Sequence, residues 1–214
     1  MGCGKSSVGR YLSELLCCPF VDLDAVIEQR SGRSIPEIFE SDGEAAFRQM
    51  EHEALSDILE EAGKLSAPLA PSHSKAAGPS PYPGVGKCQF RTTTSQPLSN
   101  PQNVLILALG GGTVVTPECA EIVREKTECI YLRASVETLL AHLSEEAAGR
   151  PMLSGCHVER PQGDETSTHH LRTRIETLMS QRSHIYESTA HHIIDTDGLS
   201  IDTIAQTIIE ILDR

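Results

Sequence analysis

The 214-residue sequence lacks tryptophan and is poor in aromatic residues, with four tyrosines and four phenylalanines. It contains no apolar run near the roughly 18 residues that a membrane-spanning helix requires. Its first residues also lack the basic-then-apolar order of a secretion signal. We therefore expect a cytoplasmic protein with no membrane partner.

Basic residues are also scarce. The chain has 18 lysines and arginines against 30 aspartates and glutamates, for a formal net charge of -12. Nucleic acids and anionic membranes are bound through clustered basic side chains. The composition thus argues against a nucleic-acid partner, and any bound anion must be held by a few local groups.

Paired cysteine motifs are absent. The number of cysteines is odd, and no two of them form a C-x-x-C pair. Free thiols are therefore favoured over disulfides or a zinc site. The seven cysteines are Cys3, Cys17, Cys18, Cys88, Cys119, Cys129 and Cys156.

The pattern of apolar residues predicts strands that alternate with helices. Such alternation indicates an α/β fold with a parallel sheet. The expected strands are 19–24, 104–114, 128–134 and 192–195. Helices are expected over 5–18, 25–30, 34–63, 135–147, 169–190 and 200–213, with Ser34 and Ser135 as N-caps.

Residues 65–103 differ from the rest of the chain. Seven of the 12 prolines lie between Pro68 and Pro101, among serine, threonine, glycine and alanine. This composition is typical of a loop or a disordered insertion. We therefore expect a single domain over 1–214, interrupted by this insertion.

A Gly-Lys-Ser triplet stands at the start of the first expected helix. It matches the end of the phosphate-loop pattern G-x-x-x-x-G-K-[ST], whose first glycine would lie before Met1. The triplet alone occurs by chance in many loops, but the helix that must follow it is present. The Lys5 ammonium and the backbone N–H groups of the loop are predicted to bind phosphate, and the Ser6 hydroxyl is predicted to bind magnesium. The loop residues are Gly2, Cys3, Gly4, Lys5, Ser6 and Ser7.

Two carboxylates follow in "FVDLD". Side chains of an extended segment alternate between its faces, so Asp22 and Asp24 are expected on one face. One of them could hold magnesium-bound water while the other takes a proton from an attacking hydroxyl. The alternative is that the pair only caps the helix beginning at Ala25.

In chain order, the motifs resemble those of shikimate kinases. They are "GCGKSSVGRYL", "PFVDLDAVIEQRSGRSIPEIFESDGEAAFRQMEHEAL", "LALGGGTV", "IYLRAS", "GRPML" and "LRTRIETLMSQRSHIYESTA". The resemblance covers 1–64 and 104–212. It implies a P-loop, nucleoside-kinase-like, three-layer α/β fold with a parallel sheet, in a monomeric enzyme of aromatic amino acid biosynthesis. The implied reaction is phosphorylation of the shikimate 3-hydroxyl with ATP and Mg²⁺.

The same resemblance assigns roles to individual residues. Asp24 corresponds to the aspartate at the reacting hydroxyls, as base or orienting group, and Asp22 to the one near magnesium. Arg48 and Arg182 correspond to the arginines that bind the substrate carboxylate. The backbone of Gly110, Gly111 and Gly112 corresponds to the glycines that approach the substrate closely. Arg150 corresponds to the arginine that faces the transferred phosphoryl group, within a mobile lid expected at about 150–170.

The residue types suit these roles, since guanidinium groups bind carboxylates through two parallel hydrogen bonds. Each assignment also has a simpler alternative. Arg48 and Arg182 lie in helices rich in glutamate and glutamine, where arginine commonly forms a solvated pair. The glycines could form an ordinary turn after a strand.

The sequence departs from the resemblance at three places, of which the insertion at 65–103 is one and should be tolerated as a surface connection. His142 stands near a position where the family carries an arginine, which predicts a lost or pH-dependent nucleotide contact. The family's first, central strand would precede Met1, so we expect an N-terminally truncated chain that lacks this strand. The alternatives are a non-catalytic, vestigial relative and another small-metabolite P-loop kinase, such as a gluconate kinase.

Overall fold

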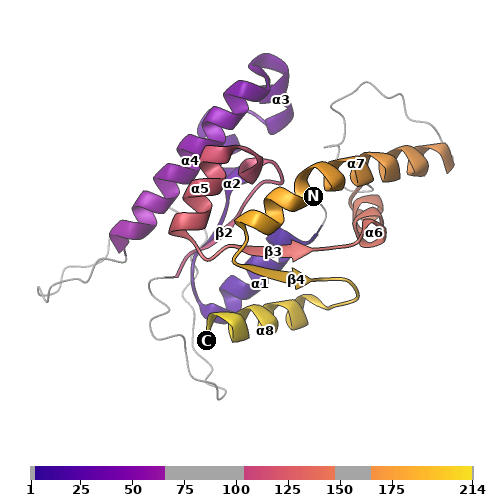
Figure 1. Cartoon of the computed structure of the whole chain (residues 1–214). Helices are drawn as coiled ribbons and strands as arrows, with labels where there is room; N and C mark the ends of the chain where they lie inside the picture. Colours follow the sequence, from indigo (N-terminus) through magenta and orange to yellow (C-terminus); the bar gives the residue numbers. More distant parts are fainter. Residues whose placement is uncertain (1–2, 66–103, 148–164, 214) are drawn as a thin grey trace, which may run out of the picture.

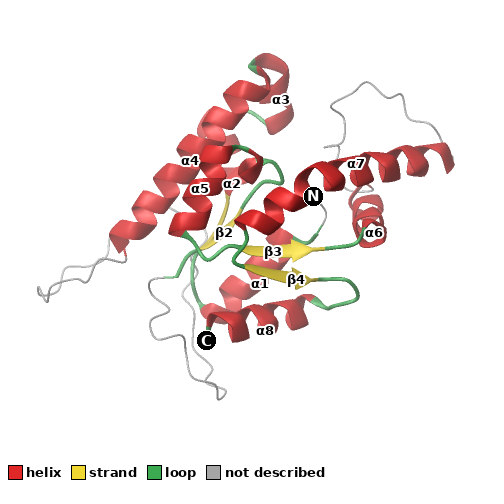
Figure 2. Cartoon of the chain, viewed as in Figure 1, coloured by secondary structure: helices red, strands yellow, loops and turns green. Residues whose placement is uncertain are grey.

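The computed structural model describes residues 3–65, 104–147 and 165–213 (Figure 1). Helices and short strands alternate along these residues (Figure 2). The strands are β1 (Phe20–Asp22), β2 (Ile106–Ala108), β3 (Ile130–Arg133) and β4 (His192–Asp195). The helices are α1 (Lys5–Leu16), α2 (Leu23–Ser31), α3 (Ile35–Ser41), α4 (Gly43–Leu65), α5 (Pro117–Lys126), α6 (Val136–Ala147), α7 (Glu165–Thr189) and α8 (Ile201–Leu212), with a 3₁₀ turn, η2, at Thr113–Val115.

The strands form two parallel pairs. In the first pair Val21 of β1 lies opposite Leu107 of β2, and in the second Tyr131 of β3 lies opposite Ile193 of β4. Within the described ranges the two pairs are separate two-stranded sheets. The predicted α/β class with parallel strands is confirmed.

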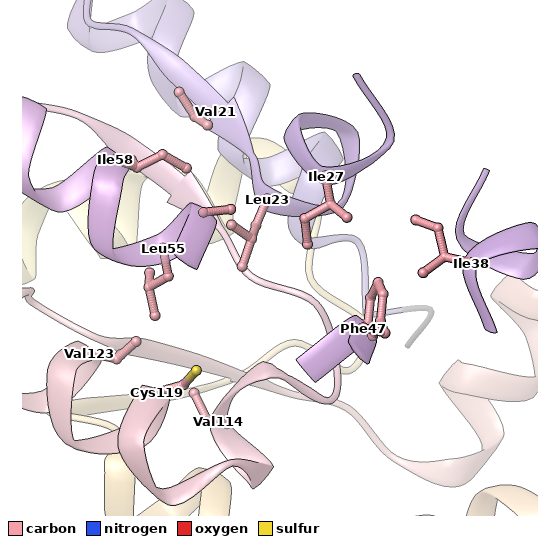
Figure 3. Close-up of a cluster of buried hydrophobic side chains, with 11 residues drawn as sticks. Val21, Leu23, Ile27, Ile38, Phe47, Leu55, Ile58, Val114, Cys119 and Val123 are labelled. Atoms are coloured by element: carbon pink, nitrogen blue, oxygen red, sulfur yellow. The ribbon is translucent and has the colours of Figure 1, made fainter. Parts of the chain in front are cut away.

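Apolar side chains fill both faces of the strands. One cluster joins β1 to the helices α2, α3, α4 and α5 (Figure 3). A second cluster lies on the other side, where Val8 and Leu12 of α1 meet Ile204 and Ile208 of α8. Helices thus cover the strands from two sides, which makes the three layers expected of this class.

The first helix is shorter than predicted. Its buried residues Val8 and Leu12 lie one turn apart, which explains why the segment is helical. Cys17 has φ 50°, in the left-handed region, and its N–H bonds to the Glu14 carbonyl oxygen. The helix therefore ends at Leu16, although the apolar pattern continues through Cys18.

The segment 34–63 contains two helices. Glu37 accepts a hydrogen bond from the Ser34 backbone N–H at 2.7 Å, so Ser34 begins α3 as predicted. Gly43 has φ 79° and separates α3 from α4. Because side chains disfavour this left-handed conformation, a glycine after Asp42 marks the break.

The predicted strand over 104–114 is too long. Its regular part is β2, which ends at Ala108, and the chain then turns through Gly110 and Gly112 into η2. The apolar residues beyond Ala108 serve packing rather than pairing, since Val114 belongs to the cluster of Figure 3.

A cross-strand ion pair joins the carboxyl ends of β3 and β4. Arg133 lies opposite Asp195, and its Nε is 2.5 Å from Asp195 Oδ1. The Thr196 N–H also bonds to the Arg133 carbonyl oxygen at 2.8 Å. These contacts determine the register of the pair.

Five cysteines lie in the described ranges, and all five are free thiols. Cys88 and Cys156 lie outside these ranges, as does the predicted insertion except for Leu65, the last residue of α4. Among the described helices, none is both long and apolar enough to cross a membrane.

Candidate active site

The carboxyl ends of β1 and β2 lie beside the start of α1. The Ser6 hydroxyl, in the first turn of α1, donates a hydrogen bond to Asp22 Oδ2 at 2.8 Å. In open parallel sheets, ligands bind outside the carboxyl ends of the strands. The local topology thus brings the predicted loop residues and the predicted aspartates together.

The start of α1 has the geometry of an anion site. Gly4 precedes the helix with φ 75°, and its carbonyl oxygen accepts the first helical bond, from the Val8 N–H at 2.9 Å. The N–H groups of Lys5, Ser6 and Ser7 therefore have no acceptor within the helix. Such N–H groups, together with the helix dipole, favour a bound phosphate.

Asp24 is not in an extended segment, so that part of the prediction is wrong. Asp22 ends β1 and caps α2, where its Oδ1 accepts a hydrogen bond from the Asp24 N–H at 3.2 Å. Asp24 lies in the first turn of α2. The capping alternative therefore holds for Asp22, but the turn of the helix still keeps the two carboxylates close together.

The surroundings of Asp24 disfavour its ionised form. Burial raises the pKa of the Asp24 carboxyl, and the nearby carboxylates of Asp22 and Glu51 raise it further. Lys5 acts in the opposite direction. A carboxylate held in this way is a stronger base than an exposed one.

The glycine loop lies against both predicted substrate-binding elements. A β-carbon at Gly110 would lie 2.7 Å from Asp24 Oδ1, and one at Gly112 would overlap the Arg48 guanidinium. Neither glycine has a left-handed φ. Their absent side chains therefore provide space next to Asp24 and Arg48, which an ordinary turn would not require.

Arg48 is held by a buried carboxylate. Its Nη1 is 2.5 Å from Glu51 Oε2, and Glu51 is 1% exposed. Glu51 Oε1 accepts a second hydrogen bond, from the Thr113 hydroxyl at 2.7 Å. Arg48 also pairs with the exposed Glu44 at 2.9 Å. The solvated pair expected from the sequence, between Arg48 and Glu44, is therefore one of two ion pairs that Arg48 forms.

Glu51 is not among the residues predicted from the sequence. It lies three residues after Arg48 on α4, a spacing that brings side chains together on a helix. The spacing was visible in the sequence, but the burial was not. Glu51 is buried where other parts of the chain pack against α4, among them η2, whose Thr113 is 62 residues further along.

Arg182 lies on α7, the helix that contacts the glycine loop through Tyr186. It lies one turn before Tyr186, whose hydroxyl donates a hydrogen bond to the Gly111 carbonyl oxygen at 2.5 Å. Arg182 is partly exposed, and no carboxylate of the described residues forms an ion pair with it. Tyr186 is not among the predicted residues either, although it follows Arg182 at helical spacing.

Other predicted residues contribute less or lie elsewhere. Gly2 and Arg150 are outside the described ranges, and so is most of the expected lid, because α7 begins at Glu165. Cys3 is partly buried against two apolar clusters. His142 is exposed on α6.

The oxygen atoms of Ser6 and Asp22 fit a magnesium ion. Mg²⁺ prefers oxygen ligands and is usually held by one or two carboxylates, with the substrate phosphates and water completing its shell. Within the described residues, no cluster of three or more histidines, cysteines, aspartates or glutamates could form an all-protein metal site. The donor set therefore matches a metal that binds together with a nucleotide.

Comparison with known proteins gives a consistent result. The family model described as shikimate kinase matches residues 1–67 and 79–213. A shikimate kinase of Thermus thermophilus is 33% identical over 214 residues, covering all of this chain and 86% of the relative. One of Chlorobium chlorochromatii is 30% identical over 213 residues, covering 87% of the relative.

Solved structures show the same fold. A shikimate kinase from Acinetobacter baumannii in complex with shikimate has a TM-score of 0.67 and 27% identity, covering 99% of this chain and 88% of the other. A shikimate kinase from Bacteroides thetaiotaomicron has a TM-score of 0.66 at 23% identity, which supports the fold.

Proposed function

Because the chain belongs to the shikimate kinase family, we propose that the residues gathered at the carboxyl ends of β1 and β2 phosphorylate the 3-hydroxyl of shikimate. Members of this family are phosphotransferases that use ATP and Mg²⁺. The observation that carries the proposal is the contact of Asp24 and Arg48 with a single glycine loop. The non-catalytic and gluconate kinase alternatives receive no support from the comparisons.

Arg48 and Arg182 bind the shikimate carboxylate in this proposal. The Arg48 guanidinium lies against Gly112, held by Glu51 and Glu44. Arg182 lies one turn of α7 before Tyr186, whose hydroxyl bonds to Gly111 of the same loop. Two planar guanidinium groups supply the paired donors that a carboxylate accepts best.

The start of α1 binds the ATP phosphates. The N–H groups of the first turn, which have no acceptor within the helix, can bind an anion, and the Lys5 ammonium supplies a full positive charge at the same helix start. Cys3 and the undescribed Gly2 complete the loop in this proposal. The undescribed Arg150 is assigned to the transferred phosphoryl group from the sequence resemblance alone.

Ser6 and Asp22 would hold the magnesium ion, which neutralises charge on the phosphates when bound. Their hydrogen bond of 2.8 Å already brings the two oxygen atoms together. Asp22 also orients Asp24 through the backbone bond at the start of α2. Metal binding and base positioning therefore depend on the same carboxylate.

Asp24 takes the proton from the shikimate hydroxyl as the hydroxyl oxygen bonds to the γ-phosphorus of ATP, and the bond from that phosphorus to the bridging oxygen breaks, so that ADP leaves. Its raised pKa increases its affinity for that proton, and Gly110 leaves room for the substrate next to Oδ1. The monomeric state in this proposal rests on the family resemblance alone.

A coupled assay of ADP release with shikimate, ATP and Mg²⁺ tests the proposal. Arg48→Lys should raise KM for shikimate by about tenfold or more. The lysine ammonium cannot form the two parallel hydrogen bonds that a guanidinium group donates to a carboxylate. Arg124→Lys, an exposed change on α5, should leave KM unchanged. Phosphorylation of gluconate in preference to shikimate, or an equal KM in both variants, would contradict the proposal.

A further inference from the structure

The Tyr186 hydroxyl holds the middle of the glycine loop at 110–112. It donates a hydrogen bond to the Gly111 carbonyl oxygen at 2.5 Å, across 75 positions of the chain. The carbonyl oxygens of the other two glycines are bonded within the turn itself, to the N–H groups of Thr113 and Val115 at 3.3 Å and 3.0 Å. Of the side chains that the structure describes, Tyr186 is the one that bonds to the backbone of these glycines.

This bond fixes the direction of the next N–H group. In a trans peptide unit the carbonyl oxygen and the N–H lie in one plane and point in opposite directions, and no described peptide bond is cis. The Gly112 N–H shares its peptide unit with the Gly111 carbonyl oxygen, so it points away from Tyr186. Within the described residues this N–H has no acceptor, and it can therefore donate to a ligand.

The Gly112 N–H lies beside an arginine that suits the same kind of ligand. A β-carbon at Gly112 would overlap the Arg48 guanidinium, so the backbone of the loop and the arginine are in close contact. Backbone N–H groups and guanidinium groups both donate to anions, and such hydrogen bonds are stronger than neutral ones. An anion held by Arg48 thus has a second donor next to it.

We infer that Tyr186 is a positioning residue for the substrate, which acts through the peptide unit of Gly111 and Gly112. It holds the Gly112 N–H in the direction in which it donates to the carboxylate bound by Arg48. This role rests on the proposed function, in which that carboxylate belongs to shikimate. A tyrosine hydroxyl has a single proton to donate, and Tyr186 uses it for the loop rather than for the substrate.

The packing of α7 keeps Tyr186 in place, so the bond constrains the loop rather than the helix. Ile185 and Tyr186 pack against the cluster that includes β1 and α4. Glu187 pairs with Arg133 of β3 at 3.5 Å. The Tyr186 ring also lies against the Tyr131 ring, with centroids 5.3 Å apart. Glycine has the most backbone freedom of any residue, so loss of the hydroxyl releases the loop while the helix stays.

Two tyrosine variants test this role by steady-state kinetics. Tyr186→Phe keeps the ring and should raise KM for shikimate roughly threefold to tenfold, with KM for ATP within about twofold, as expected for one weakened hydrogen bond. Tyr131→Phe is the matched control, since its hydroxyl has no hydrogen-bond partner among the described residues. Equal KM for shikimate in the two variants, or an equal rise in KM for both substrates, would overturn the inference.

Glycine labelling measures the contact without any substrate. With ¹³C-carbonyl and ¹⁵N labels on glycine alone, the nitrogens of Gly111 and Gly112 are the only ones that follow a labelled carbonyl, because no other glycines are adjacent in the sequence. The NMR signal that joins the Gly111 carbonyl carbon to the Gly112 nitrogen should shift in Tyr186→Phe and stay in place in Tyr131→Phe.

An unshifted signal in Tyr186→Phe, or equal shifts in both variants, would overturn the inference. Failure of the unchanged chain to phosphorylate shikimate would contradict the proposed function instead. The glycine signals would still show in that case whether Tyr186 holds the loop, so the two failures are distinguishable.

Discussion

Glu51 and Arg48 form a buried ion pair between neighbouring turns of α4, with Glu51 1% exposed and the Arg48 side chain 21% exposed. Removing one partner of such a pair leaves the other without compensation. Because Arg48 retains some contact with water and with Glu44, we expect a smaller cost than for a fully enclosed pair.

Glu51→Gln should therefore lower the free energy of unfolding by about 1–3 kcal/mol. It should also raise KM for shikimate more than it lowers kcat, because Glu51 positions Arg48. Urea unfolding and steady-state kinetics measure the two effects. Glu44→Gln removes the exposed partner of the same arginine and should cost less than about 0.5 kcal/mol. Equal effects of the two variants would show that the burial of Glu51 has no functional importance.

Gly110→Ala should reduce kcat by roughly tenfold to a hundredfold. The added β-carbon would lie 2.7 Å from Asp24 Oδ1, so the carboxylate must move. Small displacements of a reacting group are costly for catalysis. Gly63→Ala is a matched control, since nothing lies within 4 Å of its added carbon and alanine favours the helix. A Gly110→Ala enzyme with normal kcat would contradict a role of Asp24 in the reaction.

Asp24→Asn should abolish most activity, by roughly a hundredfold or more, and should also stabilise the protein at neutral pH. The pKa of Asp24 is higher in the folded than in the unfolded chain, mainly because of burial. Its contribution to stability is therefore complete below the unfolded pKa of about 3.9 and is lost as the pH rises through the folded value.

Thermal unfolding of both proteins from pH 4 to pH 8 checks this sign. The stability of Asp24→Asn relative to the unchanged chain should increase with pH and then level off. Because other carboxylates titrate in both proteins, their contributions cancel in the difference. A difference that decreases with pH would mean that the ionised form of Asp24 is favoured in the fold.

Cys17→Gly should stabilise the chain by up to about 1 kcal/mol. Cys17 has φ 50° at the end of α1, a conformation that costs a residue with a side chain roughly 1–2 kcal/mol. Glycine removes this cost but has a more flexible unfolded state. Urea unfolding measures the net change. Cys18→Gly, which removes a buried side chain instead, should be destabilising.

Much of the fold could be predicted from local patterns, since the start of α1, the whole of β4 and the amphipathic α8 lie where periodicity indicated them. The misplaced boundaries arise where one side chain changes the local conformation. Asp22 caps α2, so the helix begins two residues earlier than expected and includes Asp24. The apolar residues after Ala108 resembled a strand because side chains packed in the core and side chains of a buried, paired strand are of the same apolar types.

Lys5 and Ser6 could be predicted as site residues because the Gly-Lys-Ser triplet stands at the start of a helix that the sequence also predicts. Glu51 and Tyr186 were missed because their importance depends on contacts distant in the sequence. Glu51 bonds to Thr113, 62 residues away, and Tyr186 bonds to Gly111, 75 residues away. A single sequence indicates which side chains share a helix face, but it does not show which loop will cover that face.

The ion pair between Arg133 and Asp195 has a consequence for the order of folding. It joins residues 62 positions apart, so β3 and β4 can pair only after a long segment that includes α6 and α7 has closed into a loop. The entropy of that closure is lost before any ladder bond forms. We therefore expect the helices to form first and the β3–β4 ladder to be completed late, with the ion pair selecting against a register shifted by two residues.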